Sequence, residues 1–75
     1  MKKDLNKEYL DMMIAEKEMA LIHLGYQNKY WASEDGQKAK GTEIASELIK
    51  ENEKQIAIIE KELAFFKKEH ASRIR

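Results

Sequence analysis

Two stretches of the chain repeat apolar residues at alternating intervals of four and three positions. In the first stretch the repeat runs through Leu5, Tyr9, Met12, Glu16, Met19, His23, Tyr26 and Tyr30. In the second it runs through Ala45, Ile49, Asn52, Ile56, Ile59, Leu63, Phe66 and His70. This spacing is typical of a helix that packs along one stripe against another helix, as in a coiled coil. The pattern predicts two helices, at about residues 4–33 and 42–71, and we call each repeat the seam of its helix.

The polar stretch 34–41 separates the two predicted helices and contains two glycines. Such a composition indicates a turn, and Thr42 is a suitable N-cap for the second helix. An alternative places the N-cap at Ser33, so that the second helix begins earlier and contains both glycines. A short connection folds two long helices back on each other. The predicted fold is therefore all-α, a single domain over residues 1–75 built as an antiparallel, coiled-coil-like two-helix hairpin.

The first helix carries more apolar residues than one seam can use. A second stripe comprises Leu10, Met13, Ile14, Ala20, Leu21, Leu24 and Trp31, and the second helix adds Ile58 and Phe65 off its seam. A helix that is apolar around most of its circumference is buried on more than one side. We therefore expect a homo-oligomer, with a dimer that forms a four-helix bundle as the favoured arrangement. The residues expected at the interface with a second copy or another protein are Leu10, Ile14, Leu21, Leu24, Trp31, Ile58 and Phe65.

Polar residues interrupt both seams. If the chain reverses near residue 37 or 38, paired positions sum to about 75, which places His23 opposite Asn52. A buried polar pair can fix the register of two helices, and we predict this role for these two residues. Solvent-facing positions, or a histidine with a function of its own, are the alternatives. Tyr26, Tyr30 and Trp31 are predicted to pack on the start of the second helix, with an exposed recognition patch as the alternative.

Composition excludes several kinds of chemistry. The chain has no cysteine and two histidines, so disulfides and thiolate metal sites are absent and a zinc site is not expected. The sequence has no serine elbow, no glycine-rich phosphate loop and no Glu-x-x-His motif. Glu16 is assigned to a solvent-reaching position at the edge of its seam. His70 is assigned to a frayed last turn of the second helix, where it complements the negative end of the helix dipole. We expect no catalytic residue, no cofactor, no metal and no small-molecule substrate, and hence a protein that is not an enzyme.

The expected location is the cytoplasm. No run approaches the roughly 18 apolar residues that span a bilayer, and Lys2 and Lys3 are not followed by the apolar run of a signal peptide. We also expect no membrane binding, because the middle of the chain is acidic. A composition rich in lysine, glutamate and isoleucine suggests an AT-rich bacterial or phage genome.

Charge is balanced in total but uneven along the hairpin. The chain holds 14 basic and 14 acidic residues. Residues 1–8 and 67–75, which a hairpin brings to one end, hold seven basic and three acidic side chains, whereas residues 9–66 hold seven and eleven. A candidate anion-binding pole comprises Lys2, Lys3, Lys67, Lys68, Arg73 and Arg75. A simpler explanation is that these cations complement the negative end of the second helix.

These features favour a non-enzymatic, homo-oligomeric helical interaction module, a small regulator, inhibitor or assembly factor that acts by protein–protein contact. The alternative is a helical-hairpin protein that binds RNA or DNA through the basic pole. No motif in the chain identifies a target.

Overall fold

Helix accounts for nearly all of the chain because few residues interrupt it. The computed structural model describes the backbone of residues 5–74 and the side chains of residues 6–73, and within this range only Ser33 and Gly41 lie outside a helix. The chain has no proline that would break a helix interior. The three helices are α1 (Leu5–Ala32), α2 (Glu34–Lys40) and α3 (Thr42–Ile74). The prediction of an all-α protein is confirmed.

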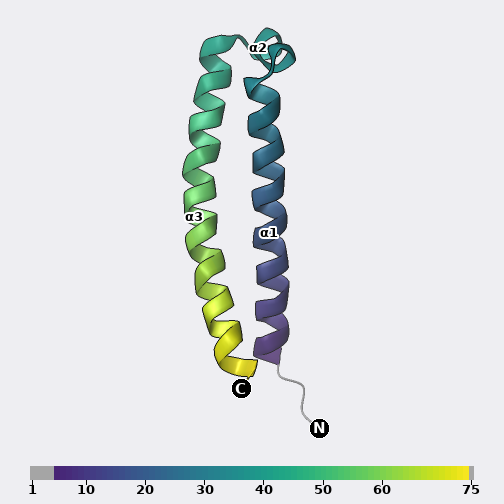
Figure 1. Ribbon diagram of the computed structural model, residues 1–75, viewed down its shortest axis with the longest axis vertical. Helices are drawn as coiled ribbons and strands as arrows, with labels where there is room; N and C mark the ends of the chain where they lie inside the picture. The colour runs from purple at the N-terminus through teal and green to yellow at the C-terminus, as the bar shows by residue number, and fades with distance from the viewer. Residues whose placement is uncertain (1–4, 75) are drawn as a thin grey trace.

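The two long helices lie side by side and run in opposite directions, and α2 lies at the end where the chain turns back (Figure 1). The molecule is a rod that measures 57 × 18 × 13 Å along its principal axes. Its radius of gyration of 16.8 Å is well above the value of about 11 Å expected for a compact domain of this length. A rod built from two helices has a large surface for its small interior.

The segment predicted as a loop is the short helix α2, because Ser33 provides an N-cap for it. The Ser33 hydroxyl accepts a hydrogen bond from the backbone N–H of Gly36 (3.2 Å) and donates one to the Tyr30 carbonyl (2.6 Å). The Gln37 side chain donates to the Trp31 carbonyl at 3.3 Å. These bonds satisfy carbonyls at the end of α1 and an N–H at the start of α2. The prediction of a loop over residues 34–41 is therefore wrong.

Gly41 lies between α2 and α3 and caps both helices. Its φ of 87° lies in the left-handed region that favours glycine. The Gly41 N–H donates to the Gln37 carbonyl at 2.7 Å, and the Gly41 carbonyl accepts from the Ala45 N–H at 3.0 Å. The N-cap position of α3 thus falls on Gly41 rather than on Thr42, which is the first residue of the helix.

Close packing at Gly36 holds α2 against the end of α1. Gly36 is buried, and a Cβ atom there would collide with the Tyr30 carbonyl and lie 2.9 Å from the Cα atom of Trp31. Only glycine allows this approach of two backbones. As a result α2 lies beyond the end of α1, and the first turns of α3 lie beside α2 rather than beside α1 (Figure 1).

This placement shifts the register between α1 and α3. Asn52 donates hydrogen bonds to Gln27 and Asn28, and Lys17 forms an ion pair with Glu62. Paired positions therefore sum to about 80 rather than to about 75. The predicted pairing of His23 with Asn52 is wrong, because it assumed that the end of α1 lies beside the start of α3.

The predicted seam is the inward face of α3 but not of α1. Every seam residue of α3, from Ala45 to His70, is buried or half-buried. The seam residues of α1 from Tyr9 to Tyr30 are exposed instead, and the stripe that faces α3 comprises Leu10, Ile14, Lys17, Leu21, Leu24, Asn28 and Trp31. Leucine and isoleucine gain more from burial than tyrosine, which has a polar tip that favours water. The more aliphatic stripe of α1 therefore turns inward, and the assignment of the α1 seam to the hairpin interior is wrong.

The interior between the two long helices is small. Among the described side chains, the buried hydrophobic ones are Leu10 and Ala45, and no large side chain is fully buried. A single small core rarely contributes more than about 3–5 kcal/mol to the stability of a chain of this size.

Candidate protein-interaction surface

The exposed seam of α1 forms a stripe along the outside of the molecule. We call it the outer stripe, and its described members are Tyr9, Met12, Glu16, Met19, His23, Tyr26 and Tyr30. Most of these positions follow an inward-facing residue by two places, which is a rotation of about 200° around the helix. Most of the stripe therefore lies on the side of α1 away from α3, and Tyr9, His23 and Tyr30 reach the border with α3. The exposed fraction is 66% for Met12, 65% for Met19 and 67% for Tyr26.

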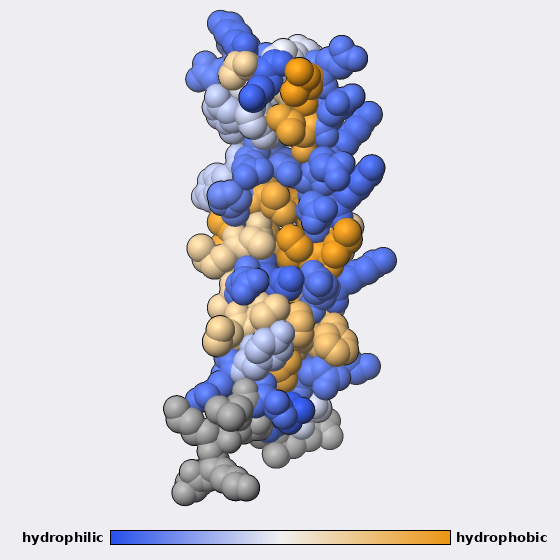
Figure 2. Space-filling view, turned by 180° about the vertical axis from the view of Figure 1, so that it is seen from behind, coloured by the Kyte–Doolittle hydropathy of each residue, from blue (hydrophilic) through white to orange (hydrophobic). Residues whose placement is uncertain are grey.

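Helix α3 adds a second exposed apolar line. Ile44, Ile58 and Phe65 are more than half exposed and are separated by multiples of seven residues, so that they share one side of the helix. Phe65 lines a shallow hollow of about 280 Å³ together with Tyr9. Tyr9 also packs edge-to-face on Phe66, with 6.4 Å between ring centroids. The outer stripe and the α3 line therefore meet near the open end of the helix pair. Figure 2 shows apolar side chains gathered along one face of the rod, interrupted by polar belts.

Five of the seven residues predicted to contact a partner lie on the stripe that faces α3. Leu10 is buried there, whereas Ile14, Leu21, Leu24 and Trp31 are half-buried. Their apolar surface is largely used inside the helix pair, so their assignment to an outer face is corrected. Ile58 and Phe65 remain exposed, as the prediction required. Sequence reasoning missed the outer stripe as a surface, although its 4-3 spacing was the available signal.

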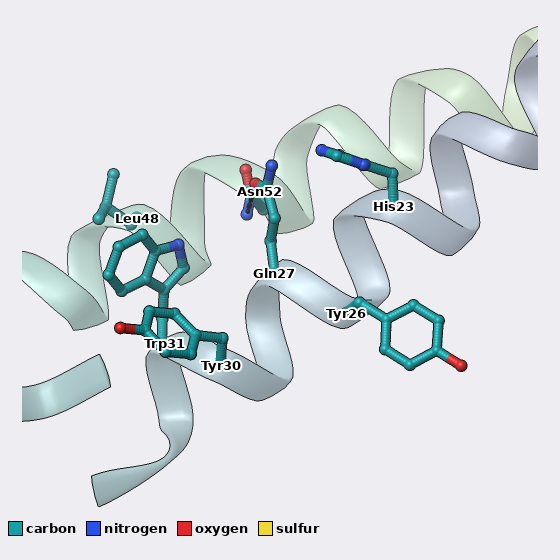
Figure 3. A pocket seen from close by; sticks show the side chains of 7 residues that line it. All are labelled: His23, Tyr26, Gln27, Tyr30, Trp31, Leu48 and Asn52. Carbon is teal, nitrogen blue, oxygen red and sulfur yellow. Dashed lines mark hydrogen bonds between the residues drawn. The ribbon is translucent and has the colours of Figure 1, made fainter. Parts of the chain in front are cut away.

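A hollow of about 450 Å³ opens between α1 and α3 near the turn (Figure 3). It is lined by His23, Tyr26, Gln27, Tyr30, Trp31, Leu48 and Asn52. The Asn52 amide donates to Gln27 Oε1 at 3.1 Å and to Asn28 Oδ1 at 2.9 Å. These three amides, rather than a pair of His23 with Asn52, form the polar contact between the long helices near the turn. His23 is exposed, although it borders the same hollow.

The aromatic residues near the turn separate into two groups. Trp31 is half-buried and lies with Leu48 of α3 in the hollow (Figure 3). Tyr30 is 47% exposed, although its ring contacts that of Trp31 at 4.9 Å. Tyr26 points away from α3, and Lys29 Nζ lies 5.3 Å from the centre of its ring. The prediction that all three aromatics pack on the second helix holds for Trp31 and is wrong for the two tyrosines.

Ion pairs fix the two long helices at the shifted register. Lys17 Nζ lies 3.1 Å from Glu62, and Lys67 Nζ lies 3.5 Å from Glu18. His70 lies within α3 and is half-buried, and its Nε2 atom lies 2.5 Å from an Asp11 carboxylate oxygen, without the alignment of a hydrogen bond. This last contact is an ion pair only when His70 is protonated. Exposed pairs contribute at most about 1 kcal/mol each, so they specify the alignment more than they stabilise it.

The predicted basic pole is only partly described. Lys2, Lys3 and Arg75 lie outside the described residues. Lys67 is engaged with Glu18, whereas Lys68 and Arg73 are exposed at the end of α3. Arg73 lines the hollow near Tyr9 together with Glu69, so an acidic group accompanies it. The anion-binding pole remains a prediction.

Comparison of the chain with family models, with curated proteins and with solved structures gives no match. Within residues 5–74, no helix combines the length and the apolar character needed to cross a membrane. In the same part of the chain, no three side chains of the histidine, aspartate or glutamate type come together in a way that could hold a metal ion.

Proposed function

We propose that the protein is a non-enzymatic, homo-oligomeric helical interaction module, a small regulator, inhibitor or assembly factor that acts by protein–protein contact. The outer stripe of α1 carries this proposal, because its apolar members Tyr9, Met12, Met19, Tyr26 and Tyr30 are exposed along the length of the helix. Soluble monomers rarely leave extended apolar patches in contact with water. A stripe with 4-3 spacing has the geometry that packs against another helix.

The small interior of the helix pair supports the same proposal. Leu10 and Ala45 are the buried hydrophobic residues among the described side chains, so the chain alone gains little from burial. Each additional 100 Å² of apolar surface removed from water contributes about 2.5 kcal/mol. A partner that covers the outer stripe therefore stabilises the folded chain as it binds.

The proposal is tested by placing a charge at the centre of the outer stripe. Met19→Glu is expected to lower the self-association of the chain, because a carboxylate at a helix–helix contact is costly to bury. Ala57→Glu is the matched control, since Ala57 is an exposed apolar residue in the middle of α3, outside the apolar surfaces described above. Analytical ultracentrifugation measures both variants beside the unmodified chain. Equal self-association of Met19→Glu and the unmodified chain, or an unmodified chain that is monomeric, contradicts the proposal.

A further inference from the structure

The outer stripe has the spacing of a helix-packing seam, and most of its surface is exposed in the single chain. Its described members follow one another at intervals of three and four residues from Tyr9 to Tyr30. Such a repeat keeps the contact side of a helix turned toward a single partner over several turns. The stripe of α1 that faces α3 is a separate repeat on the other side of the helix. Helix α1 is therefore built to be packed between two helices, and this chain supplies one of them.

The exposed area of the rod is large enough to include a contact of standard size. The chain exposes 6050 Å², whereas a folded protein of 8.8 kDa exposes about 4,800 Å² on average. The difference of about 1,200 Å² exceeds the roughly 800 Å² that each partner buries in a stable interface of standard size. A second long helix along the outer stripe would remove an area of this order.

We propose that the occupant of the outer stripe is the α1 helix of a second copy of this chain, packed antiparallel about a two-fold axis. This inference rests on the proposed self-association and specifies its contact surface. In an antiparallel pair of seams, positions whose numbers sum to 35 share a layer. Met12 then packs against the partner's His23, Glu16 against the partner's Met19, and Tyr9 against the partner's Tyr26.

The side chains that flank the outer stripe favour this orientation. Along one edge of the contact between the two α1 helices, Glu8 lies beside the partner's Lys29. The two-fold axis repeats this contact of opposite charges at the other end. On the same edge, the small side chain of Ala15 lies beside the large side chain of the partner's Ile22. Lys29 is exposed beside the outer stripe, next to Tyr26. Pairs of opposite charge at flanking positions select orientation in helix–helix contacts.

A parallel arrangement lacks this complementarity. It places each seam residue in a layer with its own copy, so that Glu16 faces Glu16 across the contact. Like charges in one layer destabilise a helix pair. The antiparallel arrangement puts the thioether of Met19 in that position instead, which is soft and adapts to its neighbours.

Thiol crosslinking tests the orientation directly, because the natural chain has no cysteine. The double variant Met12→Cys with His23→Cys places two thiols in a shared layer of the antiparallel pair. Within one chain they are about 16 Å apart along the helix and cannot bond to each other. The single variants Met12→Cys and His23→Cys are the controls, since each thiol is then about 16 Å from its own copy. Both positions of substitution are exposed in the folded chain, so the fold of the single chain is not disturbed.

The expected result is that the double variant migrates as a covalent dimer on a denaturing gel after mild oxidation, and that the single variants stay monomeric. Crosslinking of the single variants as readily as the double variant would show parallel packing and overturn the proposal. A double variant that sediments as a dimer without crosslinking would mean that the copies meet through another face. A double variant that sediments as a monomer, together with a monomeric unmodified chain, would instead refute the proposed self-association itself.

Discussion

At the scale of single residues, the turn determines how the long helices meet. Ser33 caps α2 and Gly36 lets it approach the end of α1. Asn52 then reaches Gln27 and Asn28 across the helix pair. Few side chains are buried, so these local contacts contribute much of the information that selects one alignment.

Substitution of Gly36 and of Gly25 by alanine is expected to change the free energy of unfolding in opposite directions. Gly36→Ala should lower the free energy of unfolding by about 1–3 kcal/mol, because the added methyl group collides with the backbone of Tyr30 and Trp31. Gly25→Ala should raise it by about 0.5–1 kcal/mol, since nothing lies within 4 Å of the new Cβ atom and alanine favours helix. Urea denaturation at one fixed protein concentration measures both. Similar effects of the two changes would contradict the packing described for α2.

The amide contact at Asn52 gives a second prediction at this scale. Asn52→Ala should lower the free energy of unfolding by about 1–2 kcal/mol, because it removes the donor of two part-buried hydrogen bonds. His23→Ala should change it by less than about 0.5 kcal/mol, as is usual for exposed residues. The comparison is made in the Met19→Glu background, where contacts with a second copy are expected to be lost. A larger effect at His23 than at Asn52 would restore the pairing that the sequence first suggested.

At the scale of the helices, the sequence predicted α3 better than α1. The single apolar repeat of α3, from Ala45 to His70, is its inward face. Helix α1 carries two such repeats, and periodicity alone does not say which one turns inward. The choice depends on packing against α3, which favours the stripe with Leu10, Leu21 and Leu24 because aliphatic side chains gain most from burial.

The turn was predicted less well, for a related reason. The glycines at 36 and 41 indicated a loop, but only the tertiary approach of α2 to α1 explains why glycine is needed at Gly36. The predicted register followed from the assumption of a loop, so the error placed His23 opposite Asn52. The exposed positions of Ile58 and Phe65 were predictable because α3 has one repeat and these residues lie off it.

A charge on each of these two α3 residues should separate folding from association. The double variant Ile58→Glu with Phe65→Glu should keep its helical circular dichroism, because both side chains are more than half exposed. It should weaken self-association, since Phe65 adjoins Tyr9 of the outer stripe. Loss of helical signal in this variant would place both residues in the core of the folded chain and contradict the exposure described here.

At the scale of the whole molecule, the elongated shape and the exposed apolar surface both favour self-association. A rod of 57 × 18 × 13 Å with two buried hydrophobic residues among its described side chains has little interior of its own. Its exposed large apolar side chains lie largely on the outer stripe and on the α3 line, where a second chain can cover them. In the proposed dimer, association supplies the core that one chain lacks.

Self-association is tested by the mass of the unmodified chain in solution. Light scattering behind a sizing column, repeated across a hundredfold dilution, gives the mass of the unmodified chain at each concentration. A particle of twice the 8.8 kDa chain mass is expected at the higher concentrations, with a fall toward the mass of one chain on dilution as the dimer dissociates. A well-folded particle of 8.8 kDa at every concentration would contradict it, because the outer stripe would then be stable in water without a second copy.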